Sequence, residues 1–272
     1  MFPDRNIYTG YTNYIKSFIN TDINSWHFKS NEFYTCILEH VSYEHGIEYL
    51  DTIKDKFKSF YDEHKYDLIQ LCKKNDLYGS TKKFNYSDFI ECSPSNLRYI
   101  LHSLIILTFM KECNLETVDI IEIGGGYGGL CLFLYEISKF FNIKINSYSM
   151  FDLPEVKLLQ KKYLETLNIT NVNYESTNNT QNLKPNSFLI SNYALSEINE
   201  DLRRDYIENV LKPYTSYGFI CWNTFSPYNY NFIDNKDITI IYEYPDFNKR
   251  TANSDNYYVF YKPLKIPNFN FI

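Results

Sequence analysis

The stretch VDIIEIGGGYGGLCLFL, from Val118 to Leu134, combines an apolar run, a glycine-rich turn and the first half of an apolar segment with helical character. The run Val118–Ile123 predicts a buried strand. Glycine tolerates positive φ and lets the backbone approach a ligand closely. Because open parallel sheets bind ligands at the carboxyl ends of their strands, the turn after Ile123 predicts a cofactor site.

On the C-terminal side of this stretch, short strand-like segments alternate with helical ones. The strand-like segments of this half are VDIIEIG, KINSYSMFD, NVNYES, SFLISNY, YGFICWN, ITIIYEYPD and NYYVFYKP. Such alternation predicts an α/β fold, with a parallel sheet covered by helices on both faces. Only the polar segment FNKRTANSD separates the last two, which leaves no room for a crossover helix and predicts an antiparallel hairpin at a sheet edge. The expected sheet is Rossmann-like, with five parallel-type strands and a C-terminal antiparallel hairpin.

The N-terminal part of the chain has a different pattern. From Trp26 to Asn75, apolar residues recur at spacings of three and four among charged residues, which predicts helices. A further helix is predicted to start with Ser93 as N-cap and Pro94 in the first helical position, and to lead directly into the sheet. We therefore expect a helical cap or substrate region over residues 1–115 and a cofactor-binding domain over residues 116–272.

Composition argues against several classes of protein. The formal net charge is -6 and no Lys/Arg cluster is present, so a nucleic-acid partner is not expected. The run Leu104–Met110 is far shorter than the roughly 20 apolar residues of a membrane helix, and the first residues lack the pattern of a secretory signal. The six cysteines are scattered without a C-x-x-C pair, which argues against a zinc or disulfide framework. A cytoplasmic protein that acts on a small or neutral molecule is expected.

The identity of the nucleotide at the turn is a separate question. Gly124, Gly126 and Gly129 also satisfy G-x-G-x-x-G, the dinucleotide pattern. Glu122, two residues before the first glycine, favours S-adenosylmethionine, because a carboxylate there can face the ammonium group of that cofactor. Asp152, at the end of the second strand, can bind the ribose hydroxyls of either cofactor, or it can cap the following helix.

Three segments, in order along the chain, carry a resemblance to a known family. They are IEIGGGYGGLCLFL, FDLPEVKLLQKKYL and FLISNYALSEINEDLRRDYIENVLKP, with a looser match in SPSNLRYILHSLIIL. Over roughly residues 118–223 the chain resembles the sugar O-methyltransferases found among surface-glycan genes. The resemblance implies the sheet of a class I methyltransferase, S-adenosyl-L-methionine as cofactor, and a sugar nucleotide or glycan as acceptor.

The expected cofactor-binding residues lie at the carboxyl ends of the first, second and fourth strands. They are Glu122, Gly124, Gly125, Gly126, Tyr127, Gly128, Asp152, Leu153 and Asn192. After the third strand, Glu175 or Ser176 is a candidate contact to adenine.

The acceptor is expected over the ends of the first and fourth strands, because methyl transfer requires oxygen, carbon and sulfur in line. Glu197 is the first candidate for the base that takes the acceptor proton, although an acidic first-turn residue can equally stabilise a helix dipole. His102 is the second, since histidine titrates near neutrality; a satisfied histidine on a helix face is the alternative. The expected acceptor-binding residues are Arg98, Tyr193, Ser196 and Tyr228.

No metal site is expected. The fourth strand ends in Asn192 rather than in an acidic residue, which favours metal-independent chemistry. His40, Glu44 and His45 lie close together in sequence, but their spacing does not place three ligands on one helix face.

Three other functions stay open at this point. The chain could methylate another small molecule at oxygen or nitrogen, it could be a dinucleotide-dependent oxidoreductase, or it could bind a cofactor without catalysis. The glycine loop alone does not separate these alternatives.

Overall fold

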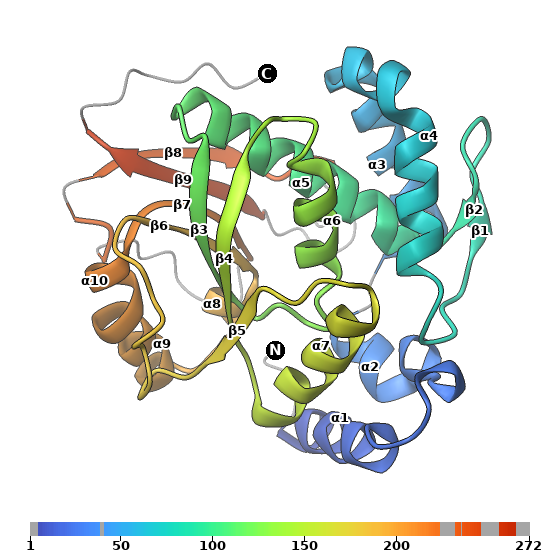
Figure 1. Ribbon diagram of the computed structural model, residues 1–272, viewed down its shortest axis with the longest axis horizontal. Helices are drawn as coiled ribbons and strands as arrows, with labels where there is room; N and C mark the ends of the chain where they lie inside the picture. The colour runs from blue at the N-terminus through green and yellow to red at the C-terminus, as the bar shows by residue number, and fades with distance from the viewer. Residues whose placement is uncertain (1–4, 39–40, 224–231, 235, 246–255, 265–272) are drawn as a thin grey trace.

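The computed structural model describes residues 5–38, 41–223, 232–234, 236–245 and 256–264, and Figure 1 shows a helical N-terminal part packed beside a twisted sheet. The sheet has the strand order β5-β4-β3-β6-β7-β9-β8. Its strands are β3 (Thr117–Ile123), β4 (Lys144–Phe151), β5 (Val172–Glu175), β6 (Ser187–Asn192), β7 (Thr215–Trp222), β8 (Lys236–Tyr242) and β9 (Tyr257–Pro263).

The pairing of these strands confirms the expected fold class. The strands β3 to β7 pair in parallel, whereas β9 runs antiparallel to both β7 and β8. The hairpin therefore closes one side of the sheet, with β8 as the edge strand and β9 inserted beside β7. The sheet is thus Rossmann-like, mostly parallel with a C-terminal antiparallel hairpin, and the N-terminal part of the chain is helical, as expected.

Burial along the strands follows from their places in the sheet. The central strand β6 is buried at its first five positions and half-buried at Asn192, as expected for a parallel strand covered on both faces. The edge strand β8 is half-buried or exposed throughout, and its Ile240 and Tyr242 are exposed. Continuous burial therefore distinguishes the central strand β6 from the edge strand β8.

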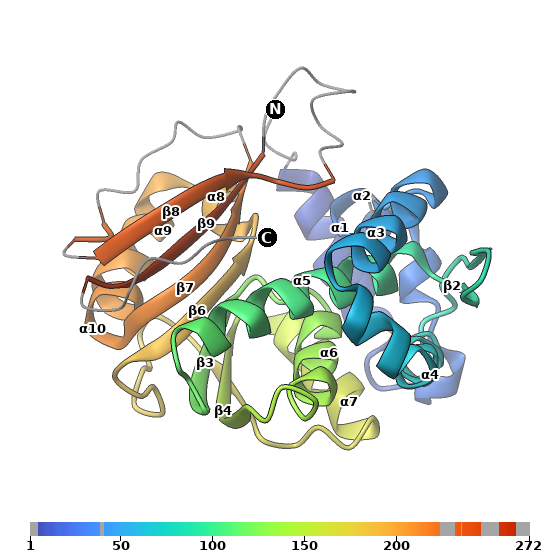
Figure 2. The same cartoon turned by 90° about the horizontal axis from the view of Figure 1, so that it is seen from above.

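Two groups of helices cover the two faces of the sheet (Figure 2). One hydrophobic core joins the N-terminal helices, α5 (Pro94–Glu112), α6 (Gly129–Ile137) and α7 (Pro154–Thr166) to one face. A second core joins α8 (Ala194–Glu197), α9 (Glu200–Tyr206) and the following π-helical turn to the other. The last helix before β7 is α10 (Lys212–Tyr214).

The helix α5 is the structural centre of the molecule, since 15 of its 19 residues are buried. It begins where the sequence predicts, with Ser93 as N-cap and Pro94 in the first turn. The Ser93 side chain does not cap the helix, however; its hydroxyl donates to Asp76 over 2.7 Å, and its backbone N–H donates to the same carboxylate. The residue type at the cap is thus explained by a contact with the preceding helix.

The N-terminal part contains four longer helices, two 3-10 turns and a two-stranded hairpin. The helices are α1 (Arg5–Phe18), α2 (Glu32–Ile37), α3 (Tyr43–Lys56) and α4 (Lys58–Asn75); the 3-10 turns are Ile23–Ser25 and Phe28–Ser30; the hairpin pairs β1 (Phe84–Asn85) with β2 (Glu91–Cys92). Among the helices that the structure describes, none is long and apolar enough to cross a membrane.

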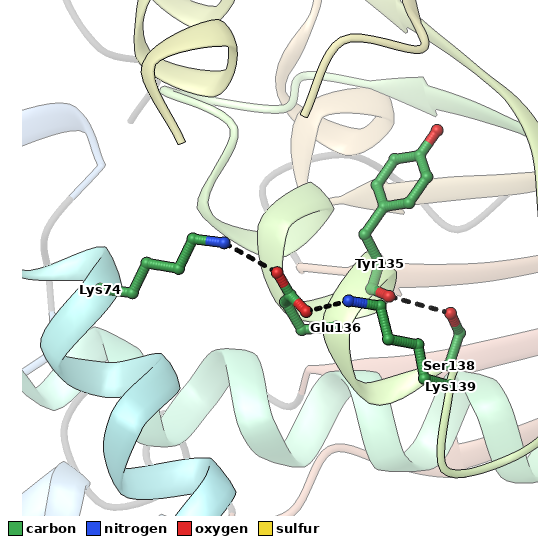
Figure 3. A network of polar contacts seen from close by, with 5 residues as sticks. All are labelled: Lys74, Tyr135, Glu136, Ser138 and Lys139. Atoms are coloured by element: carbon green, nitrogen blue, oxygen red, sulfur yellow. Dashed lines mark hydrogen bonds and ion pairs between the residues drawn. The ribbon is translucent and has the colours of Figure 1, made fainter. Parts of the chain in front are cut away.

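Polar contacts tie α4 to α6 as well. Figure 3 shows Glu136 of α6 between two lysines: Lys74 of α4 donates to it over 2.8 Å, and Lys139 donates to its other oxygen. The Ser138 hydroxyl donates to the Tyr135 carbonyl at the end of the same helix. The side chains of Lys74 and Glu136 are 33% and 25% exposed, respectively. This ion pair therefore adds little stability and mainly fixes the relative orientation of α4 and α6.

Candidate cofactor and acceptor site

The order of the strands reverses direction beside β3, and in open α/β sheets such a reversal forms a crevice. From β3 the chain moves outward to β4 and β5, and it then returns to β6 on the other side of β3. Ligands in open α/β sheets bind at the carboxyl ends of the strands at such a reversal. The ends of β3, β4 and β6 are followed by Gly124, Asp152 and Tyr193, so the candidate residues for cofactor and acceptor follow the same edge of the sheet.

The glycine-rich loop leaves β3 with backbone conformations that other residues rarely adopt. Gly124 and Gly126 have φ of 77° and 56°. A Cβ on Gly124 would lie 2.3 Å from Cβ of Ala194, so this glycine lets the loop pack against the turn after β6. A Cβ on Gly126 would come no closer than 3.7 Å to Leu38, in ordinary contact. The two glycines therefore differ, since a side chain on Gly124 would overlap Ala194, whereas a side chain on Gly126 would only touch Leu38.

Asp152 is held beside the loop by its neighbours. Its carboxylate accepts the Leu153 backbone N–H over 2.8 Å and the Gln160 side-chain amide over 3.0 Å, and the same amide donates to the Gly126 carbonyl over 2.8 Å. Burial raises the pKa of Asp152 to about 7, and these hydrogen bonds oppose the shift. The helix α7 starts at Pro154 without a side-chain cap, so Asp152 is not its N-cap. The exposed Leu153 side chain lies next to this carboxylate.

Glu122 lies beneath the loop rather than at its surface. The side chain is 2% exposed, and one carboxylate oxygen accepts the Tyr148 hydroxyl over 2.8 Å. A Cβ on Gly125 would lie 2.9 Å from that same oxygen, which places the carboxylate directly against the loop backbone. Burial raises the pKa of Glu122 to about 7, because the ionised form loses hydration.

We expect the Glu122→Gln variant to be more stable than the parent protein at pH 8 by about 2 kcal/mol, with little difference at pH 4.5. A carboxyl whose pKa is raised from 4.5 in the unfolded chain to about 7 in the fold binds a proton more tightly in the fold. Its contribution to stability is complete below the unfolded pKa and is lost as the pH rises through 7. Urea unfolding of both proteins from pH 4.5 to pH 8 measures this, and equal slopes of stability against pH would contradict it.

The Tyr127 side chain points away from the cofactor crevice. It is 1% exposed, its hydroxyl exchanges hydrogen bonds with the Asn75 side chain, and Lys29 lies 4.3 Å from its ring centroid. Only the backbone of Tyr127 is left for the cofactor contact expected from the sequence. The side chain instead joins the glycine loop to the N-terminal helices, a role that the G-x-G-x-x-G pattern does not reveal.

The turn after β6 carries the candidate acceptor residues. Tyr193 has φ of 65°, an uncommon conformation for a bulky residue and one that often marks a functional site. The Ser196 hydroxyl is buried and bonded to the Tyr193 carbonyl and to Asn223, so it holds the turn together rather than facing a ligand. Asn192 accepts the Cys221 thiol over 3.1 Å.

Glu197 follows this turn and is half-buried. The Asn223 amide donates to its carboxylate over 2.6 Å. Burial raises the pKa of Glu197, and the bond from Asn223 lowers it. A carboxylate with raised pKa and a fixed rotamer is suited to accept a proton.

His102 is not suited to act as a base, because it is neither accessible nor able to titrate near neutrality. The side chain is fully buried, and its Nε2 lies 3.3 Å from the Tyr258 hydroxyl. Burial, followed by the charge of Arg98, lowers the pKa of His102 to about 3, so the imidazole is neutral and does not titrate near neutrality. The half-buried Arg98 lies one turn away on α5, and its guanidinium is 5.7 Å from the Tyr99 ring centroid.

The remaining candidates lie elsewhere. Glu175 is 2% exposed and accepts the Asn182 side-chain amide over 2.8 Å. Tyr228 and His40 lie outside the described residues. His45 forms a capping box with Ser42 at the start of α3, which gives it a local structural role. In the described ranges, no group of three or more His, Cys, Asp or Glu residues could hold a metal ion.

Several residues of the site carry no recognisable signal in the sequence. Tyr8 of α1 is one: burial, followed by the negative charges of Glu197 and Asp152, raises its pKa to about 12. Gln160 and Leu38 are others, since they contact or face the loop from helices distant in sequence.

Solved structures similar to this chain include three methyltransferases. An S-adenosylmethionine-dependent methyltransferase from Clostridium acetobutylicum is 12% identical, with a TM-score of 0.44 over 59% of this chain and 90% of that one. An rRNA methylase from Streptococcus thermophilus is 13% identical, with a TM-score of 0.42 over 59% and 95%. TrmK from M. capricolum, solved with S-adenosyl-homocysteine, is 14% identical, with a TM-score of 0.41 over 61% and 71%. Similarity at this level carries no argument about cofactor or acceptor.

No protein-family model matches the chain, and no curated protein matches it.

Proposed function

We propose that this chain is an S-adenosylmethionine-dependent O-methyltransferase that acts on a hydroxyl of a sugar nucleotide or glycan. The observation that carries the cofactor assignment is the unit formed by Asp152, Gln160 and Gly126 at the strand-order reversal. The Gln160 side-chain amide joins a carboxylate suited to ribose hydroxyls to the carbonyl of a loop glycine that has a positive φ. The sugar acceptor is supported by the resemblance of the three sequence segments.

The residues present fit the cofactor. Asp152 would accept hydrogen bonds from the two ribose hydroxyls, and Leu153 would pack against the nucleoside. Glu122, below the loop, would stabilise the ammonium group through its charge. The loop glycines and the Tyr127 backbone would border the amino-acid part. When bound, the cofactor supplies a methyl group on a positively charged sulfur.

The chemistry left to the protein is alignment and proton removal. The acceptor oxygen forms its bond to the methyl carbon as the carbon–sulfur bond breaks, and the hydroxyl proton must leave. Glu197 would take this proton, because its carboxylate lies at the end of β6 and Asn223 fixes its orientation. His102, which is neutral and buried, has no part in this step of the proposal.

The N-terminal helices would select the acceptor. Tyr8 of α1 and Arg98 of α5 would contribute to this selection, since, in addition to burial, the charges of Glu197 and Asp152 raise the pKa of Tyr8, and the charge of Arg98 acts to lower that of Tyr193. The division into a cap region, residues 1–115, and a methyltransferase domain, residues 116–272, is part of this proposal.

Calorimetric titration of the purified protein with S-adenosylhomocysteine, and separately with NAD, tests the cofactor. Micromolar binding of the first ligand and none of the second supports the proposal. Binding of NAD would instead support the dinucleotide-dependent oxidoreductase. Binding of S-adenosylhomocysteine without methyl transfer to any sugar or amine acceptor would favour a cofactor-binding domain without catalysis.

We expect Glu197→Gln to lower kcat about 100-fold and to leave the affinity for S-adenosylhomocysteine within about twofold. The amide keeps the shape of the side chain but cannot take a proton. Transfer of a tritiated methyl group to a nucleotide sugar, with calorimetry in parallel, separates the two effects. Glu200→Gln on the exposed start of α9 is the matched control. An unchanged kcat would mean that Glu197 serves only the helix dipole.

A further inference from the structure

A second polar cluster lies beside the candidate site, where β6, the C-terminal hairpin and two helices meet. Its centre is Glu243, which follows β8 and is 5% exposed. One carboxylate oxygen accepts the Tyr193 hydroxyl, and the other accepts the Asn256 side-chain amide over 2.6 Å. The Asn256 carbonyl also accepts the Glu243 backbone N–H over 2.9 Å. Two side chains are thus fixed by one carboxylate.

The N-terminal helices contribute to the same cluster. Tyr49 of α3 is 3% exposed, and its ring meets that of His102 edge to face at 6.4 Å. After burial, the charge of Glu243 raises the pKa of Tyr193 further, and Arg98 lowers it. We call Tyr49, Arg98, His102, Tyr193, Glu243, Asn256 and Tyr258 the Glu243 cluster.

Within the described part of the chain, two buried atoms of this cluster have no hydrogen-bond partner: Oδ1 of Asn256 and Nδ1 of His102. The Tyr258 hydroxyl donates to the Tyr244 carbonyl over 3.0 Å, so the proton between Tyr258 and His102 belongs to Nε2 of the histidine. His102 Nδ1 is then an acceptor. Asn256 uses its amide on Glu243, so its Oδ1 is an acceptor too. Buried acceptors of this kind require a donor from a ligand or water.

Tyr193 connects the cluster to the reaction site. It directly follows Asn192, the last residue of β6, and adopts the positive φ given above. Such a conformation costs a bulky residue free energy, which its hydrogen bond to Glu243 offsets. Because the phenol donates its proton to Glu243, its oxygen lone pairs are left to accept a hydrogen bond at the carboxyl end of β6.

We propose that Glu243 is a positioning residue for the acceptor: it holds Tyr193 and Asn256 so that their oxygens accept hydrogen bonds from hydroxyl groups of a neutral polyol. The inference rests on the proposed function and adds the chemistry that recognises the substrate. The cluster offers acceptor atoms, which a hydroxyl-rich ligand complements. An amine-bearing sugar serves as the comparison, because Glu243 and Arg98 act on the Tyr49 and Tyr193 phenols with opposite charges.

The test compares Glu243→Gln, Tyr193→Phe and the double variant with the parent protein. Tritiated methyl transfer is measured to UDP-glucose, UDP-galactose and GDP-mannose, and to UDP-glucosamine as an amine-bearing probe. We expect each single variant to raise KM for the methylated nucleotide sugar about tenfold or more, with binding of S-adenosylhomocysteine unchanged. Because Glu243 holds Tyr193 as well as Asn256, we expect the double variant to raise KM by less than the product of the two single effects. The matched control is Glu63→Gln, on an exposed part of α4.

Other results would refute the role of Glu243, the polyol acceptor or the proposed function, and each can be told apart. Methyl transfer with an unchanged KM in Glu243→Gln would refute the role of Glu243 and leave the proposed function intact. Transfer to the UDP-glucosamine nitrogen alone would refute the polyol assignment. A parent protein that binds S-adenosylhomocysteine and methylates none of these probes would refute it as well. A parent protein that does not bind S-adenosylhomocysteine would refute the proposed function, and the inference with it.

Discussion

Replacement of Asp152 by alanine is expected to weaken binding of S-adenosylhomocysteine about 100-fold while the protein stays folded. Asp152 is the partly exposed carboxylate at the end of β4, and in the proposed complex it accepts hydrogen bonds from two ribose hydroxyls. Both bonds are lost in the variant, and the nearby carboxylates of Glu122 and Glu175 are each only 2% exposed. Calorimetric titration measures the change directly.

The matched control for this variant is Asp119→Ala. Asp119 belongs to β3, is half-buried, and accepts the Ser147 hydroxyl over 2.6 Å, but it lies near the opposite end of the strand. We expect this control to bind S-adenosylhomocysteine as the parent protein does. An Asp152→Ala variant whose affinity equals that of the control would place the nucleoside elsewhere, and the cofactor geometry proposed here would be wrong.

Replacement of Gly124 by alanine is expected to destabilise the fold by about 3 kcal/mol. The residue has φ of 77°, so a side chain there is strained, and its Cβ would lie 2.3 Å from the Cβ of Ala194. Relief of this overlap requires the loop after β3 and the turn after β6 to separate. Urea unfolding measures the loss of stability.

Gly126→Ala separates the two causes of this effect. Gly126 also has a positive φ, of 56°, but the nearest atom to an added Cβ is 3.7 Å away. We expect its stability to fall by only about 1 kcal/mol, from backbone strain alone. We expect its affinity for S-adenosylhomocysteine to fall strongly, because relief of that strain displaces the loop backbone that borders the proposed cofactor. Equal losses of stability in the two variants would mean that the contact with Ala194 relaxes without cost.

Much of the fold follows from local sequence pattern. The strands of the sheet, the glycine turn after Ile123 and the start of α5 at Pro94 all lie where periodicity and residue type predict them. The antiparallel hairpin was also predictable, because a connection without a helix cannot return a parallel strand. These features depend on interactions between residues close in sequence, or on burial of a whole segment, and both are visible in the sequence.

The roles of individual side chains were harder to predict from the sequence than the fold. His102 and Arg98 share a helix face in the sequence pattern, but α5 lies in the centre of the molecule, so the histidine is buried and cannot gain a proton near pH 7. Tyr127 sits within the glycine loop, yet its ring packs among the N-terminal helices. Ser93 has the residue type of an N-cap and bonds to Asp76 instead.

The sequence by itself determined the class of sheet, the place of the glycine loop and the two carboxylates beside it, because regular periodicity and positive φ are local properties. Only the tertiary structure decided which carboxylate is covered, where Tyr193 points, and that Glu243 and Asn256 meet it from the hairpin. The physical reason is that hydration and hydrogen-bond partners depend on residues far apart in the chain. Tyr193 and Glu243 are 50 residues apart in the chain, so no local sequence pattern predicts their hydrogen bond.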